Sequence, residues 1–235
     1  MKHRGAESLA DPDSAGLVKR EYSSYDEYLV HQRQKLDEIL LSGAGFPNAR
    51  VSDYRSRFYR RFRHLVQRVP ADAIIVCLGA RQGTEVEVLR ELGFRNAYGI
   101  DLNPGPENPL VRAGDFQRLD MPDRSVDLVY SNSLDHAFDL DTFFAQHRRV
   151  LKPDGFALYD LAASYEQGEK APFEATLWTR QEHVVQMALN HFRRILKLET
   201  EPSWTWMLLR GPLPFSLIET ARQDEVPTSE ELPSL

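Results

Sequence analysis

The sequence predicts an α/β protein with a mostly parallel sheet of seven strands, preceded by an N-terminal helical segment. Three observations support this fold class. From residue 74 onward, short apolar runs alternate with segments of helical periodicity. A glycine-containing turn directly follows the first apolar run, at residues 79–83. Two strand-like segments joined by Glu201-Pro202-Ser203 close the domain and predict a terminal antiparallel hairpin.

The N-terminal part is expected to form a separate helical segment. Residues 1–21 are polar and are predicted to be flexible. Ser24 and Glu27 form a capping-box pattern that begins a first helix, which ends near Gly43. A second helix is expected over residues 52–69, with an apolar stripe, arginines on its other faces and Pro70 as its stop. Residues 22–70 would serve as a lid or an oligomer surface.

The α/β domain is expected over residues 71–218. Its parallel strands are predicted at 74–78, 97–100, 110–113, 126–131 and 156–161, and its helices at 84–92, 140–151 and 180–191. This alternation predicts a parallel sheet with helices on both faces. The hairpin strands follow at 194–200 and 204–210. Residues 219–235 are acidic and are predicted to be a disordered tail.

Composition excludes several classes of protein. Hydrophobic residues make up 42% and charged residues 27% of the chain, which is ordinary for a globular protein. The net charge of -6 does not indicate a nucleic-acid surface. The single cysteine, Cys77, excludes an internal disulfide framework and a cysteine-rich zinc site. No long apolar run predicts a membrane span, and no signal peptide is predicted, so we expect a cytoplasmic enzyme.

The first strand, turn and helix predict a nucleotide site. A second strand follows and ends at Asp101, where Rossmann-like folds place an acid that hydrogen-bonds a ribose. A dinucleotide site requires two further glycines after Gly79, but Arg81 and Thr84 occupy those positions. A close approach to a pyrophosphate is therefore disfavoured, and a nucleoside cofactor without phosphates is preferred over NAD or FAD.

Three motifs follow downstream: Gly114-Asp115-Phe116, the strand-like run Val126-Asp127-Leu128-Val129, and Arg148-Arg149-Val150-Leu151-Lys152-Pro153-Asp154-Gly155. They resemble the motifs of the class I S-adenosylmethionine-dependent methyltransferases that act on small molecules. The resemblance covers residues 74–161, and the turn at residues 148–155 is its most specific part. It implies a Rossmann-like fold and S-adenosylmethionine as cofactor. Three positions depart from the family pattern: Cys77 replaces an acid, Arg81 a glycine and Asp154 a glycine. We interpret the motif Leu-Gly-Ala-Arg-Gln-Gly-Thr-Glu-Val at 78–86 as a subgroup variant.

The resemblance and the turn geometry together predict the cofactor contacts. Asp101 would bind the ribose, and Asp115 would accept from the adenine amine while Phe116 packs on the ring. Arg81 is either a solvent-facing turn residue or the partner of the methionine carboxylate. Glu85 either favours the helix dipole or accepts from the cofactor's amino group. The predicted cofactor-binding set is Gly79, Ala80, Arg81, Gly83, Glu85, Asp101, Leu102, Asp115, Phe116 and Asn132.

The loop after the fourth strand supplies the catalytic candidates. Ligands of open α/β sheets bind outside the carboxyl ends of the strands, and this loop contains Asp135 and His136. His136 titrates near neutrality and is the predicted general base, with Asp135 as its neighbour or substitute. The alternative is that the pair caps the next helix. No metal is predicted, because no His/Asp/Glu cluster with ligand spacing stands out.

These features predict methyl transfer from S-adenosylmethionine to an oxygen or nitrogen of a small molecule or glycan precursor. The arginines of the second helix suggest an anionic acceptor. Two alternatives stay open: a catalytically inactive binding or scaffold protein, suggested by Cys77 and Arg81, and an NAD-dependent oxidoreductase. No nucleic-acid or membrane partner is expected, and any homo-oligomer would form through the N-terminal helices.

Overall fold

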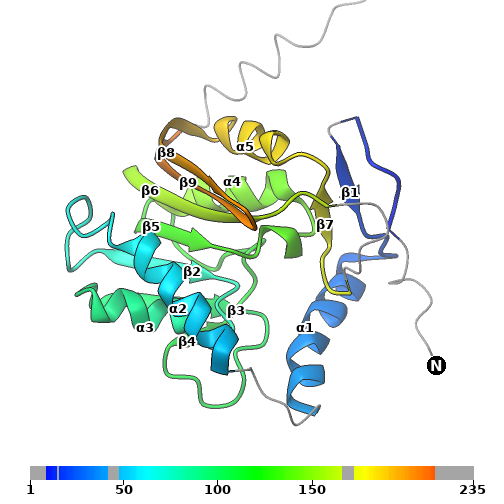
Figure 1. Cartoon of the computed structure of the whole chain (residues 1–235), viewed down its shortest axis with the longest axis horizontal. Helices are drawn as coiled ribbons and strands as arrows, with labels where there is room; N and C mark the ends of the chain where they lie inside the picture. Colours follow the sequence, from blue (N-terminus) through cyan, green and yellow to red (C-terminus); the bar gives the residue numbers. More distant parts are fainter. Residues whose placement is uncertain (1–8, 15, 42–47, 166–171, 215–235) are drawn as a thin grey trace, which may run out of the picture.

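The computed structural model describes residues 9–14, 16–41, 48–165 and 172–214 of the chain. Its main sheet consists of β2 (Ile74–Leu78), β3 (Asn96–Asp101), β4 (Val111–Ala113), β5 (Val126–Ser131), β6 (Leu151–Ala162), β8 (Phe192–Glu201) and β9 (Trp204–Pro212). The strand order is β4-β3-β2-β5-β6-β9-β8 (Figure 1). The first five strands in this order pair in parallel, while β9 runs antiparallel to both β6 and β8. The predicted fold class, with its terminal hairpin, is confirmed.

Helices cover both faces of the sheet. α2 (Asn48–Phe62) and α3 (Thr84–Glu91) lie on one face, and α4 (Leu140–Val150) and α5 (Gln181–Leu189) lie on the other (Figure 1). α1 (Tyr25–Leu41) lies outside these layers, near a small sheet formed by β1 (Leu17–Lys19) and β7 (Thr176–Trp178). α1 is attached to the segment before β7 through Gln32, whose side-chain amide donates to the Phe173 carbonyl at 2.7 Å.

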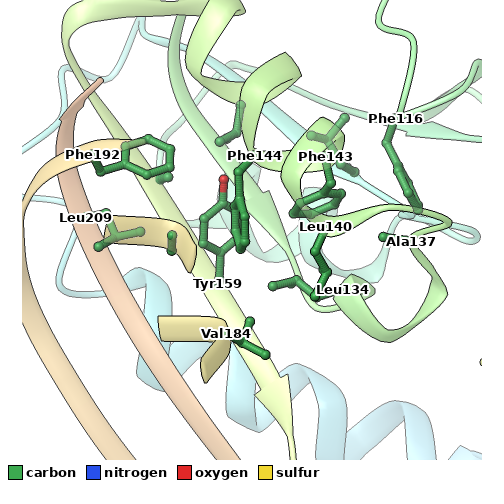
Figure 2. Packing of buried hydrophobic residues seen from close by; sticks show 14 of the residues in the cluster. Phe116, Leu134, Ala137, Leu140, Phe143, Phe144, Tyr159, Val184, Phe192 and Leu209 are labelled. Carbon is green, nitrogen blue, oxygen red and sulfur yellow. The ribbon is translucent and has the colours of Figure 1, made fainter. Parts of the chain in front are cut away.

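Strand periodicity divides the buried side chains into two cores. In β2, Val76 and Leu78 face the α4 side, whereas Ile75 and Cys77 face the α2 side, because successive side chains of a strand alternate. Figure 2 shows the first core, in which aromatic rings of α4 pack against Tyr159 of β6. Its ring contacts include Phe143–Phe144 and Phe144–Tyr159, both with centroids 5.4 Å apart. These contacts hold the strand ends, and the loops that follow them, in fixed positions.

Three features of the fold differ from the sequence predictions. The segment 1–21 is predicted to be flexible, but residues 17–19 form β1, with Leu17 and Val18 buried. The partner strand β7 is also missing from the prediction, since a three-residue pairing between distant segments leaves no local periodicity. The second helix ends at Phe62 rather than residue 69. The residues beyond it form turns, in which Leu65 and Val69 are still buried. The spacing of these apolar residues therefore indicated that they are buried, but not that the backbone is helical. Residues 1–8 and the predicted tail 219–235 lie outside the described residues.

Candidate functional site

The turn after β2 has an unusual backbone. Gly79, Arg81 and Gly83 adopt φ values of 74°, 41° and 83°, in the left-handed region that favours glycine. A Cβ at position 79 would lie 2.7 Å from the side chain of Ser133, in the loop after β5. Glycine at this position therefore allows the β2 and β5 loops to meet at the carboxyl edge of the sheet.

Asp101, at the end of β3, holds this turn. Its Oδ2 accepts the backbone N–H of Arg81 at 2.8 Å, and its Oδ1 accepts the backbone N–H of Asn103 at 2.9 Å. An ionised carboxylate has about four acceptor positions, so further donors can still bind. Asp101 borders a small cavity of about 50 Å³, to which Leu102 and Phe116 also contribute.

A larger cavity of about 500 Å³ adjoins the same turn. It is lined by seven of the predicted site residues: Gly79, Ala80, Arg81, Glu85, Asn132, Asp135 and His136. Two predicted residues line neither cavity. Gly83 approaches Leu110 and Val111, which a Cβ at position 83 would meet at about 3 Å. Asp115 accepts the Tyr25 hydroxyl of α1 at 2.5 Å. Cofactor roles for these two residues stay predictions.

His136 is held by groups that the sequence analysis did not select. The Lys35 Nζ of α1 lies 2.7 Å from Nε2 of His136, and the Phe173 carbonyl oxygen lies 3.0 Å from Nδ1. Since a carbonyl only accepts, Nδ1 carries the hydrogen and Nε2 accepts from the Lys35 amine. Burial, assisted by Lys35 and Arg81, lowers the pKa of His136 well below its usual value. The imidazole is therefore neutral at physiological pH.

Lys35 and Asp135 also titrate abnormally. Burial, with the nearby charge of Arg81, lowers the pKa of Lys35 to about 8. Burial raises the pKa of Asp135 to about 6, against the opposing effect of Lys35. At pH 7 the three residues Lys35, His136 and Asp135 thus form a cluster of a lysine ammonium, a neutral imidazole and a carboxylate. The charges of Lys35 and Asp135 both change within two pH units of neutrality.

Glu174 completes a trio with Asp135 and His136 that the sequence analysis did not anticipate. One ligand atom from each lies within 4.8 Å of the others, a spacing compatible with a metal ion. However, Lys35 already occupies Nε2 of the imidazole, and Nδ1 faces a carbonyl oxygen. In this arrangement neither ring nitrogen has a lone pair directed at the two carboxylates, so the trio serves proton transfer better than metal binding.

Several other lining residues were missed by the sequence analysis. They come from α1, α2, the segment before β7 and the start of β9, and they include Lys35, Tyr54, Phe58, Phe173, Glu174 and Trp204. A sequence signal existed for part of this set. Tyr28, Gln32 and Lys35 recur at helical spacing, and all three line the small cavity. No comparable pattern marks Glu174 or Trp204, because only the folded chain brings them to the site.

Comparison with known proteins found a matching family model for the central part of the chain. Residues 76–159, which contain the β2 turn, Asp101 and the β5 loop, match the family model described as "Methyltransferase domain". This match supports the class I S-adenosylmethionine-dependent methyltransferase fold predicted from the sequence. S-adenosylmethionine, the cofactor predicted from the sequence, is the one that this class of domain uses. No curated protein matches the chain.

Solved structures of methyltransferases share the fold. A 1,6-didemethyltoxoflavin-N1-methyltransferase from Burkholderia thailandensis is 17% identical, with a TM-score of 0.62 over 87% of this chain and 99% of that one. A putative methyltransferase from Haloferax volcanii, in complex with the activator Trm112, is 18% identical, with a TM-score of 0.54 over 71% and 95% of the two chains. A geranyl diphosphate C-methyltransferase from Streptomyces coelicolor is 15% identical, with a TM-score of 0.54 over 66% and 77%. At these identities the likeness concerns the fold alone.

The site residues of this methyltransferase domain fit the cofactor chemically. The Asp101 carboxylate suits ribose hydroxyls, and Glu85, with 5% of its surface exposed, is a buried carboxyl suited to an amino group. The small cavity beside Asp101 has room for only a few waters, and Tyr28 and Gln32 of α1 close it. Among the described helices, none is long and apolar enough to cross a membrane.

Proposed function

We propose that the domain transfers the methyl group of S-adenosylmethionine to an oxygen or nitrogen of a small molecule, glycan precursors included. One observation carries the proposal: the turn at Gly79, which Asp101 holds, borders the same cavity as the Lys35–His136 pair. When bound, the cofactor supplies a methyl group that is already electrophilic. The protein's task is therefore to align an acceptor with it and to remove a proton.

The geometry of the turn supports the following cofactor contacts. Asp101 binds the ribose hydroxyls, and Arg81 pairs with the methionine carboxylate. Burial raises the pKa of Glu85 to about 8, so this carboxyl is mostly neutral at pH 7 before the cofactor enters. A nearby cation favours the charged form of a carboxyl, and the cofactor's amino group is proposed to ionise Glu85 on binding.

The α1 helix is proposed to act as a lid over the nucleoside. Tyr28, Gln32 and Lys35 of α1 border the small cavity beside Asp101, and Tyr25 donates to Asp115. A nucleoside needs more room than this cavity provides, so α1 shifts outward when the cofactor enters. The same shift frees Asp115 to accept from the adenine amine.

Calorimetry with S-adenosylmethionine and with NAD tests the proposal. Binding of the first and not the second is expected. Asp101→Ala should weaken cofactor binding by about 1–3 kcal/mol, because it removes hydrogen bonds to a charged acceptor. Asp72→Ala is the matched control, since Asp72 is exposed before the opposite end of β2. Absence of any S-adenosylmethionine binding would overturn the proposal, and equal affinity of a folded Asp101→Ala variant would remove Asp101 from the site.

Lys35 and His136 are proposed to remove the acceptor's proton together. Below pH 8, the Lys35 ammonium donates to Nε2 of His136. Once Lys35 is neutral, its nitrogen can accept a hydroxyl proton while one of its own N–H groups still donates to the imidazole. Asp135, whose Oδ1 lies 4.0 Å from Nε2, stabilises the positive charge that forms.

A direct titration of Lys35 is expected to show a midpoint near pH 8, against an ordinary value near 10.5. The neighbouring charges should move this pKa in opposite directions. Asp135→Asn removes a charge that favours the ammonium and should lower it, whereas Arg81→Met removes a repelling cation and should raise it. NMR of protein with ¹³C-labelled lysine measures the midpoint, and Lys35→Arg identifies the signal. A midpoint above pH 10 would contradict the proposed proton transfer.

A further inference from the structure

Arg57 of α2 is a buried cation in an aromatic stack. Only 7% of its surface is exposed. Its guanidinium carbon lies 3.8 Å from the centre of the Trp204 ring and 4.3 Å from that of the Tyr54 ring. Two of its nitrogens, Nε and Nη2, are buried and make no hydrogen bond in the described part of the chain. The stacking fixes the plane of the guanidinium, while the donors on its edge lack an acceptor.

The neighbouring carboxylates are used by another arginine. Arg61, one helical turn further on, donates from Nε to Asp160 at 2.9 Å and from Nη1 to Glu201 at 2.7 Å. The remaining nearby acid, Glu85, is mostly protonated at neutral pH before the cofactor enters, because burial raises its pKa to about 8. In the loaded protein its carboxylate is proposed to pair with the cofactor's amino group. Arg57 therefore carries a positive charge that no ion pair among the described residues neutralises.

The more exposed arginines of the same helix behave differently. Arg55 forms ion pairs with Glu87 at 2.8 Å and with Glu91 at 2.7 Å.

The unpaired charge of Arg57 favours anion binding. A buried cation without a partner is costly, so an anion that binds to Arg57 gains a strong interaction. A guanidinium whose plane is fixed presents two parallel N–H groups, the arrangement that suits a carboxylate or a phosphate.

The location of Arg57 indicates which molecule carries the anion. Three rings surround its guanidinium: Tyr54, Phe58 and Trp204. All three line the large cavity. None of them lines the small cavity beside Asp101. Arg57 thus lies directly behind these rings, next to the wall of the acceptor space and away from the proposed nucleoside position.

We propose that Arg57 binds an anionic group, a carboxylate or a phosphate, on the methyl acceptor. This inference rests on the proposed function and narrows its substrate class to acidic small molecules. The same chemistry has a second source, the methionine carboxylate of the cofactor, to which Arg81 is already assigned. An experiment has to separate the two sources.

Binding of simple anions to the protein loaded with S-adenosylhomocysteine provides the test. Benzoate and phenyl phosphate serve as anionic probes, benzamide as the neutral one, and tryptophan fluorescence reports binding beside Trp204. The wild type should bind one or both anions with a Kd of about 10 mM or below and prefer them to benzamide. Arg57→Met should weaken anion binding about tenfold or more. The control variant Arg55→Met, on the exposed side of α2, should bind as the wild type does.

Measuring the binding of two cofactor analogues distinguishes the two sources of the anion. S-adenosylhomocysteine and 5′-methylthioadenosine, which lacks the amino-acid tail, should each bind Arg57→Met as tightly as the wild type. A tenfold loss for S-adenosylhomocysteine alone would assign Arg57 to the cofactor and overturn the inference. Binding of S-adenosylhomocysteine without any anion binding would overturn the inference but leave the proposed function intact. If S-adenosylhomocysteine itself does not bind, the proposed function fails.

A stability measurement excludes a merely structural role for Arg57. Removing an unpaired buried cation should leave the melting temperature of the free protein unchanged or higher, and anions should raise that of the wild type only. A lower melting temperature of Arg57→Met, with anion binding unchanged, would contradict the inference. Arg57→Lys, which keeps the charge but not the planar fork, should also lose anion affinity, and it tests the inference if Arg57→Met does not fold.

Discussion

Replacing His136 by alanine is expected to slow methyl transfer to a hydroxyl acceptor roughly a hundredfold, with cofactor affinity nearly unchanged. Among the described residues, the imidazole is the hydrogen-bond partner of the Lys35 amine, at 2.7 Å. Without it, the amine loses both its position and the group that shares the incoming proton. The loss should appear in the chemical step. Single-turnover transfer of a labelled methyl group, to an acceptor found in a panel of phenols, acids and amines, measures it.

Two further variants make this prediction specific. His136→Gln keeps a polar side chain near Lys35 but has no basic nitrogen, so it should be nearly as slow as His136→Ala. His31→Ala is the matched control, because His31 also contacts the segment before β7, with Nε2 2.9 Å from the Pro172 carbonyl oxygen. A His136→Ala rate close to that of the wild type would reduce His136 to a lining residue and leave Lys35 to act without it, with Asp135 as the next candidate base.

Replacing Asp160 by alanine is expected to lower the free energy of unfolding by about 3–5 kcal/mol. Asp160 is 1% exposed and accepts from the Arg61 Nε at 2.9 Å and from the Tyr130 hydroxyl at 3.0 Å. Arg61 is equally buried, and among the described residues the substitution would leave its charge paired with Glu201 alone. Removing one member of a buried pair is costly, because the other charge cannot return to water.

Urea unfolding with Asp123→Ala as control checks this value. Asp123 pairs with Arg149 at 2.7 Å, but its side chain is 64% exposed. An exposed pair contributes about 0–1 kcal/mol, so the control should be close to the wild type. A loss below about 1 kcal/mol for Asp160→Ala would show that the Arg61 network contributes little to stability.

The fold was largely predictable because its signals are local. β2 combines an apolar run with the turn at Gly79, and β3 and β6 each follow a helix of clear periodicity. The hairpin of β8 and β9 was predicted for the same reason, since its strands flank a short proline-containing turn. The end of the second helix was missed because Leu65 and Val69 continue the helical spacing while the backbone forms turns.

The site was predictable only where it follows the strands. Asp101 is the last residue of β3, and Asn132 and His136 follow β5. Parallel topology alone brings such positions to one edge of the sheet. No such rule predicts the positions of Lys35 and Glu174. They come from α1 and from the segment before β7, and hydrogen bonds such as that of Gln32 to the Phe173 carbonyl place these segments over the edge.

The sequence by itself thus determined the order of strands and helices, the glycine turn and the acid that follows it. These features depend on periodicity and on backbone preferences, which act between near neighbours. Only the tertiary structure decided the chemical state of the site. Burial beside Arg81 lowers the pKa of Lys35, and stacking on Trp204 holds the Arg57 guanidinium behind the ring that lines the cavity. Both effects depend on which distant side chains exclude water from a charge, and no local pattern encodes that.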